Sequence, residues 1–86
     1  MTQTIYHSHK DKYLDLFEKF MTYISVYKTD VEIPKNANIV MFDYGDENFS
    51  RYSVTVRQRL RSKNKHVVEV TRTGSKDLPW MISAAL

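Results

Sequence analysis

The stretch that decides the fold is residues 38–72, NIVMFDYGDENFSRYSVTVRQRLRSKNKHVVEVTR. It contains two apolar runs, at residues 39–42 and 67–70, with an acidic turn and an amphipathic segment between them. Short apolar runs bounded by turn signals are typical of strands, and apolar residues three or four positions apart predict a helix. The order strand, helix, strand predicts one βαβ unit, in which the two strands lie parallel.

The helix of this unit is predicted over about residues 49–62. Its apolar residues recur on one face at helical spacing: Phe49, Tyr52, Val56 and Leu60. Asp46 or Asn48 is suited to cap its N-terminus, because a short polar side chain can accept a hydrogen bond from a free backbone N–H group. Glu69 interrupts the second strand, so we expect one face of that strand to meet solvent or a charged partner.

Residues 11–27 predict a leading helix with a wide apolar face. The stripe follows a 4-3-4-3 spacing and consists of Tyr13, Phe17, Phe20, Ile24 and Tyr27. Leu14 and Met21 extend it on one side, and Leu16 and Tyr23 on the other, so that it spans about half of the circumference. A helix that packs on a small sheet needs a stripe of only about 100°. We therefore expect the excess face to form core or a dimer interface.

The sequence ends in an apolar segment, residues 77–86, DLPWMISAAL. Seven of these ten residues are apolar, and they include the single tryptophan, Trp80. An exposed segment of this kind favours aggregation, so we expect it to dock on its own sheet, on a sister subunit or on another protein. The predicted organisation is a flexible N-terminal tail (1–10), an α/β domain (11–76) and an apolar C-terminal docking tail (77–86).

A chain of 86 residues is expected to form one domain with a small core. It has no cysteine, which excludes disulfides and cysteine-based zinc sites. No apolar run approaches the roughly 18 residues of a membrane span, and the N-terminus has no apolar signal region. We expect a cytoplasmic protein without a membrane partner.

The net charge of +3 hides a division between two parts of the chain. Residues 1–50 carry −3 and residues 51–86 carry +6, an asymmetry that can attract an anionic partner or let one part complement the other. The possible anion contacts are Arg51, Arg57, Arg61, Lys63 and Lys65. An RNA- or DNA-binding module is therefore an alternative function. The sequence favours it less, because the aromatic residues lie on the core faces and do not alternate with these cations as a single-strand-binding surface requires.

The acidic turn offers a second alternative, a small enzyme that depends on a divalent metal ion. Asp43, Asp46 and Glu47 follow the first strand, where ligands bind in open α/β folds, and their carboxylates are ligands that Mg²⁺ or Ca²⁺ accepts. Their spacing matches no EF-hand loop, and Gly45 is not part of a phosphate-binding glycine motif. No nucleophile–histidine–acid motif stands out either. The preferred hypothesis predicts no catalytic residue, no cofactor, no metal site and no small-molecule substrate.

One part of the sequence resembles a known family. The segment Ile33-Pro34-Lys35-Asn36-Ala37-Asn38-Ile39-Val40, the acidic turn, the amphipathic helix and the valine-rich strand at residues 67–70 resemble a family of short archaeal and bacterial proteins of unknown function. The resemblance covers roughly residues 14–72 and implies a leading helix, a strand, a helix and a second strand. It implies no activity and no catalytic residues. The basic second helix and the apolar C-terminal segment depart from the family pattern.

The sequence predicts a single small α/β domain, a leading helix plus one βαβ unit with a short parallel sheet. Two strands alone leave two open edges, so we expect an oligomer or a larger complex. The predicted function is a non-catalytic protein–protein interaction protein, an accessory or assembly subunit that homo-oligomerises or docks on a larger complex. Its predicted interface combines the first helix with the C-terminal segment: Tyr23, Tyr27, Leu78, Trp80, Met81, Ile82 and Leu86.

Overall fold

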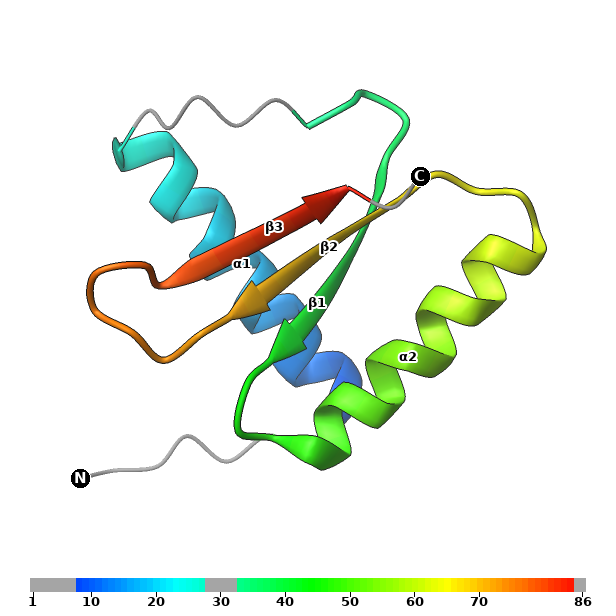
Figure 1. Ribbon diagram of the computed structural model, residues 1–86, viewed down its shortest axis with the longest axis horizontal. Coiled ribbons are helices and arrows are strands. Elements are labelled where there is room, and N and C mark those ends of the chain that lie inside the picture. The colour runs from blue at the N-terminus through cyan, green and yellow to red at the C-terminus, as the bar shows by residue number, and fades with distance from the viewer. Residues whose placement is uncertain (1–7, 28–32, 85–86) are drawn as a thin grey trace.

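The structure, a computed structural model, describes residues 8–27 and 33–84. Its elements follow in the order α1 (His9–Tyr27), β1 (Asn38–Asp43), α2 (Glu47–Ser62), β2 (Val67–Arg72) and β3 (Trp80–Ala84) (Figure 1). The predicted α/β class and the order helix, strand, helix, strand are confirmed, and a third strand follows them. Asp46 caps α2, because its carboxylate accepts a hydrogen bond from the Phe49 N–H at 3.1 Å.

The three strands form one mixed sheet in the order β1-β2-β3. β1 and β2 are parallel, with Met41 opposite Val70. β3 runs antiparallel to β2, with Ile82 opposite Val70. β2 is therefore the central strand, and β1 and β3 form the two edges of the sheet.

β3 comes from the apolar C-terminal segment, which pairs with β2 of the same chain. Trp80 and Ile82 point to one face of the sheet and Met81 to the other, since side chains alternate along a strand. Apolar residues on both faces hide the apolar–polar alternation of a half-exposed strand, and for this reason the sequence pattern did not predict a third strand. Residues 85 and 86 of the same segment, including Leu86, lie outside the described residues.

α1 crosses one face of the sheet, which we call the α1 face (Figure 1). Leu16 and Phe20 are fully buried there, and the strand residues of the same core cluster are Met41, Val68 and Val70. The ring of Phe20 also meets that of Trp80 edge-on, 5.4 Å away. The buried stripe of α1 is thus centred on Leu16 and Phe20. Tyr27, which was expected on this stripe, is 66% exposed because α1 continues past the sheet.

α2 lies beside β1 (Figure 1), and its side chains reach the face of the sheet that α1 does not cover. Arg57 of α2 extends over this face, with its guanidinium carbon 5.6 Å from the ring centroid of Phe42. It also forms an ion pair with Glu69 at 2.5 Å, and Arg61 lies 3.6 Å from the same carboxylate. Glu69 therefore meets a charged partner, and that partner is the crossover helix of its own βαβ unit.

The outer edge of β1 is closed by hydroxyl groups of both helices. Asn38 and Tyr44 donate their backbone N–H groups to β2, so the backbone groups of the odd-numbered residues between them point outward. All three outward carbonyls accept a hydrogen bond from a hydroxyl: Ile39 from Tyr13, Met41 from Ser53 at 2.5 Å, and Asp43 from Ser50 at 3.2 Å. An edge whose carbonyls are occupied in this way is a poor template for another strand.

We predict that Ser53→Ala lowers the free energy of unfolding, because it leaves the Met41 carbonyl without its hydroxyl donor in a buried place. The expected loss is about 1–3 kcal/mol, measured by urea denaturation. Ser62→Ala is the control, since Ser62 makes an exposed hydrogen bond at the end of the same helix. Equal stability of the two variants would show that the Ser53 hydroxyl does not support the edge.

Candidate functional site

The carboxyl ends of the two parallel strands carry a buried acid and its arginine partner. Asp43 ends β1 and is buried, and Arg72 ends β2 directly opposite it. The Arg72 guanidinium donates two hydrogen bonds to the Asp43 carboxylate, from Nε at 3.2 Å and from Nη2 at 2.8 Å. This bidentate interaction links the last residues of β1 and β2.

A lysine from α1 reaches the same acid. Lys12 is only 8% exposed, and its ammonium lies 2.8 Å from Asp43 and also binds Asp46, the cap of α2. The ammonium lies 5.0 Å from the ring centroid of Phe49 as well. The role of Lys12 was not predicted from the sequence, because a single lysine on a helix is usually a solvated charge. Its position in the sequence could have indicated burial. Residues 12, 16 and 20 are spaced four apart and therefore share one face of α1, which is the buried face.

The charges of this cluster shift one another's pKa values. Burial alone raises the pKa of Asp43, but hydrogen bonds from Arg72 and Lys12 outweigh it and hold the pKa below its usual 3.8. Burial alone lowers the pKa of Lys12, but its hydrogen bonds to Asp43 and Asp46 raise the pKa above 10.5. Hydrogen bonds from Lys12 and from the Phe49 N–H lower the pKa of Asp46. All of these groups therefore stay ionised at neutral pH, as partners in salt bridges.

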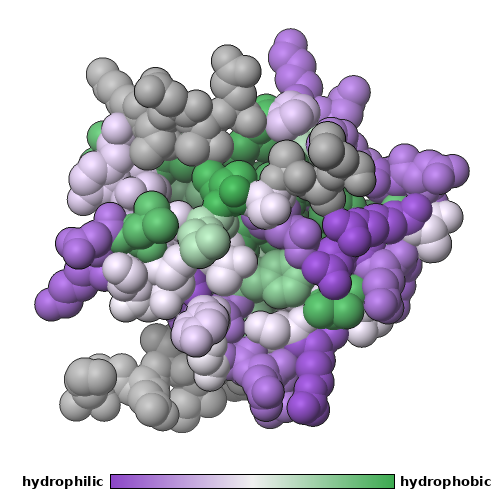
Figure 2. All heavy atoms as spheres, in the orientation of Figure 1, coloured by the Kyte–Doolittle hydropathy of each residue, from purple (hydrophilic) through white to green (hydrophobic). Residues whose placement is uncertain are grey.

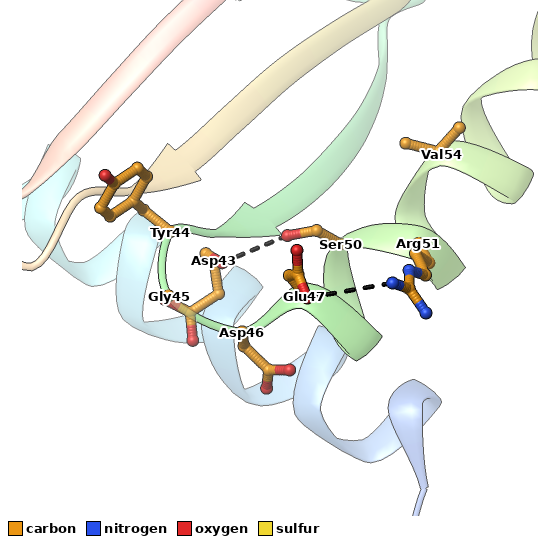
Figure 3. Close-up of a pocket in the computed structure, with 8 residues that line it drawn as sticks. All are labelled: Asp43, Tyr44, Gly45, Asp46, Glu47, Ser50, Arg51 and Val54. Atoms are coloured by element: carbon orange, nitrogen blue, oxygen red, sulfur yellow. Dashed lines mark hydrogen bonds and ion pairs between the residues drawn. The ribbon is translucent and has the colours of Figure 1, made fainter.

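An open hollow of about 440 Å³ lies beside the cluster, between the loop after β1 and the first turns of α2. Figure 3 shows Asp43 and Asp46 with their carboxylates turned toward α1, whereas Tyr44, Glu47 and Arg51 lie around the hollow. Two of the three carboxylates considered for a metal ion thus bind Lys12, and Glu47 lies 3.9 Å from Arg51. Within residues 8–27 and 33–84, no three acidic or histidine side chains are grouped as metal ligands.

The five possible anion contacts do not form one free basic surface. Arg57 and Arg61 pair with Glu69, and Arg51 lies near Glu47. Lys63 and Lys65 are exposed at the C-terminal end of α2. In Figure 2 the hydrophilic residues gather on the side of α2, while apolar residues interrupt the surface over the sheet.

The predicted partner residues that the structure describes lie on β3, on the loop before it and on the last turns of α1. Met81 is 56% exposed, Ile82 is 36% exposed, and Leu78 lies exposed before β3. The rings of Tyr23 and Tyr27 meet at 4.7 Å on the part of α1 that follows the contact of Phe20 with Trp80. Trp80 is half-buried and packs against the core, so it holds β3 in place. We call the outer edge of β3, with Met81, Ile82, Tyr23 and Tyr27, the β3 surface.

Comparisons with family models, curated proteins and solved structures found no significant match to this chain. The family resemblance described from the sequence therefore stays a prediction. In the described part of the chain, neither helix combines the length and the apolar character needed to cross a membrane.

We predict that Asp43→Asn lowers the free energy of unfolding at neutral pH by about 3 kcal/mol, because the buried Lys12 ammonium and the partly exposed Arg72 guanidinium lose their shared anion. The wild-type carboxylate has a lowered pKa, so its stabilisation is present above 3.8 and is lost as the pH falls through the folded-state pKa. Urea denaturation as a function of pH should therefore show a flatter acid limb in Asp43→Asn than in the wild type.

Glu47→Gln is the control for this comparison, because it removes an exposed carboxylate from the same turn. It should keep the wild-type acid limb. An unchanged acid limb in Asp43→Asn would contradict the role given to this carboxylate.

Proposed function

We propose that the protein is a non-catalytic protein–protein interaction protein, a small accessory or assembly subunit that binds its partner through the β3 surface. The observation that carries this proposal is the difference between the two edges of the sheet. Hydroxyls from α1 and α2 occupy the outward carbonyls of β1. β3 has no charged residue and no proline within it. Folded proteins usually protect an open edge with such residues, so a bare edge favours a binding role.

The length of α1 also supports a binding surface at β3. Lys12 and Tyr13 hold the beginning of α1 at β1, through Asp43 and the Ile39 carbonyl. From residue 12 to residue 27 an α-helix rises by about 22 Å. Two strand spacings, from β1 to β3, cover only about 10 Å. The last turns of α1, which carry Tyr23 and Tyr27, therefore continue beyond β3 (Figure 1).

The cluster at the carboxyl ends of the parallel strands supports a role without catalysis. Open α/β folds usually bind ligands there, but here Lys12 and Arg72 use the Asp43 carboxylate to join α1, β1 and β2. Groups held in such salt bridges are committed to the fold. The ion pairs of Arg57 and Arg61 with Glu69 likewise give the alternative of nucleic-acid binding less support than a free basic surface would. A cytoplasmic location is part of this proposal.

Site-specific photo-crosslinking in the cells that make the protein tests the proposal. A photoreactive residue at position 81 should form protein adducts of discrete mass, because Met81 lies on the β3 surface. The same residue at position 14 is the matched control, because Leu14 is 55% exposed, nearly as much as Met81, but lies on the first half of α1. Equal adducts from both positions, or none from position 81, would contradict the proposal.

A further inference from the structure

We propose that the partner at the β3 surface is a second copy of this chain, joined by antiparallel pairing of the two β3 strands. This inference rests on the proposed function and names the partner. Two three-stranded sheets would then form one continuous sheet of six strands. The proposal is carried by three properties of β3: the direction of its backbone groups, its self-complementary side chains and the neighbouring end of α1.

Among the described residues, no segment pairs with the outward backbone groups of β3, which form a regular row. Thr73 donates its N–H to the Pro79 carbonyl at 3.0 Å, and these two residues are opposite each other in the extended β2–β3 register. Hydrogen-bonded pairs alternate along an antiparallel ladder, so residues 81 and 83 bond to β2. The N–H and C=O groups of residues 80, 82 and 84 therefore point away from the sheet. The register between residues 80 and 84 is continuous, without a bulge.

A two-fold axis at Ile82 would satisfy this row completely. Ile82 of one copy then faces Ile82 of the second, and Trp80 of each copy faces Ala84 of the other. Residues whose backbone groups point outward would form the hydrogen-bonded pairs, so each outward N–H between residues 80 and 84 finds a carbonyl. Pairing of a strand with its own copy is isologous and closes at a dimer.

The side chains of β3 fit pairing with an identical strand. A charged residue near the axis would face the same charge in the second copy, but residues 80–84 carry none. Ile82 contributes a β-branched pair across the axis on the α1 face. Met81 lies close to the axis on the opposite face and is 56% exposed. Apolar surface would therefore be buried on both faces of the joined sheet.

The end of α1 would add buried surface area to the dimer interface beyond what the paired β3 strands bury. Stable interfaces bury about 800 Å² on each partner, and a five-residue strand edge alone covers less. Val26 and Tyr27 are each 66% exposed on the last turn of α1, which continues past β3 on the α1 face (Figure 1). The second copy's sheet would lie over these side chains. A chain of 86 residues has a small core, so this burial would add substantially to its stability.

The first test is the mass of the full-length protein by light scattering over a range of concentrations. A dimer of twice 10.2 kDa is expected. Ile82→Pro should give a folded monomer, because it removes an outward N–H and leaves the β2–β3 ladder intact. Ser83→Pro is the contrasting variant. The N–H of Ser83 faces β2, so its removal should lower the melting temperature far more than Ile82→Pro does. A wild-type monomer at all concentrations, or a dimer that persists in Ile82→Pro, would overturn the proposal.

The second test uses the absence of cysteine from the chain. In a hydrogen-bonded antiparallel pair the Cα atoms lie about 5.5 Å apart, within the range of a disulfide. Ile82→Cys should therefore form a disulfide-linked dimer with oxidised glutathione, at a rate independent of dilution over the range where the dimer persists. Met81→Cys should link more slowly, because residue 81 faces residue 83 in this register. Ile82→Cys linking no faster than Leu14→Cys would also overturn the proposal.

These results separate the inference from the proposed function. A monomer that still forms discrete adducts with a different protein at position 81 overturns pairing with a second copy and keeps the interaction role. A monomer without any adduct at position 81 overturns both.

Discussion

The fold depends on one buried ammonium group. Lys12 of α1 binds Asp43 at the end of β1 and Asp46 at the start of α2, and Arg72 of β2 binds the same Asp43. Four elements thus meet at a cluster of two cations and two anions. Buried charges are costly unless each has a partner, so the cluster stabilises only an arrangement in which α1 starts beside the end of β1. That start fixes the path of α1 across the sheet and, because α1 is long, its passage beyond β3.

The two edges of the sheet follow from this arrangement. α1 and α2 both approach β1, and each supplies hydroxyls to the outward carbonyls of that strand. Neither helix lies along the outer edge of β3, which meets α1 where Trp80 contacts Phe20. One edge is therefore closed by the same helices that build the core, and neither α1 nor α2 closes the other. The interaction role that we propose follows from this asymmetry: both helices contribute side chains to the outer edge of β1, and neither contributes them to the outer edge of β3.

Much of the fold could be predicted from the sequence, and the misses have physical causes. The apolar runs and the 3.6-residue spacing predicted the two helices and the two parallel strands. The preference of short polar side chains for helix starts indicated Asp46 or Asn48 as the cap of α2, and the structure has Asp46 there. β3 was missed because Trp80, Met81 and Ile82 put apolar groups on both faces of a strand. Lys12 was not predicted to be buried because lysine is usually exposed, although residue 12 lies on the buried stripe of α1. The hydroxyl contacts of Ser50 and Ser53 could not be foreseen, since they depend on how close α2 lies to the edge of β1.

In the role that we propose, β3 serves both folding and binding. Trp80 packs against the core, while the outward backbone groups of residues 80, 82 and 84 form an edge that no other described strand pairs with. Removing the C-terminal segment would therefore expose β2, with Val68 and Val70, as a new edge and would open the core at Trp80. Loss of association after such a truncation would say nothing about the binding surface. Only changes to groups that point away from β2 separate the two roles, because in a strand at the edge of a sheet each residue's N–H and C=O face either the fold or the partner.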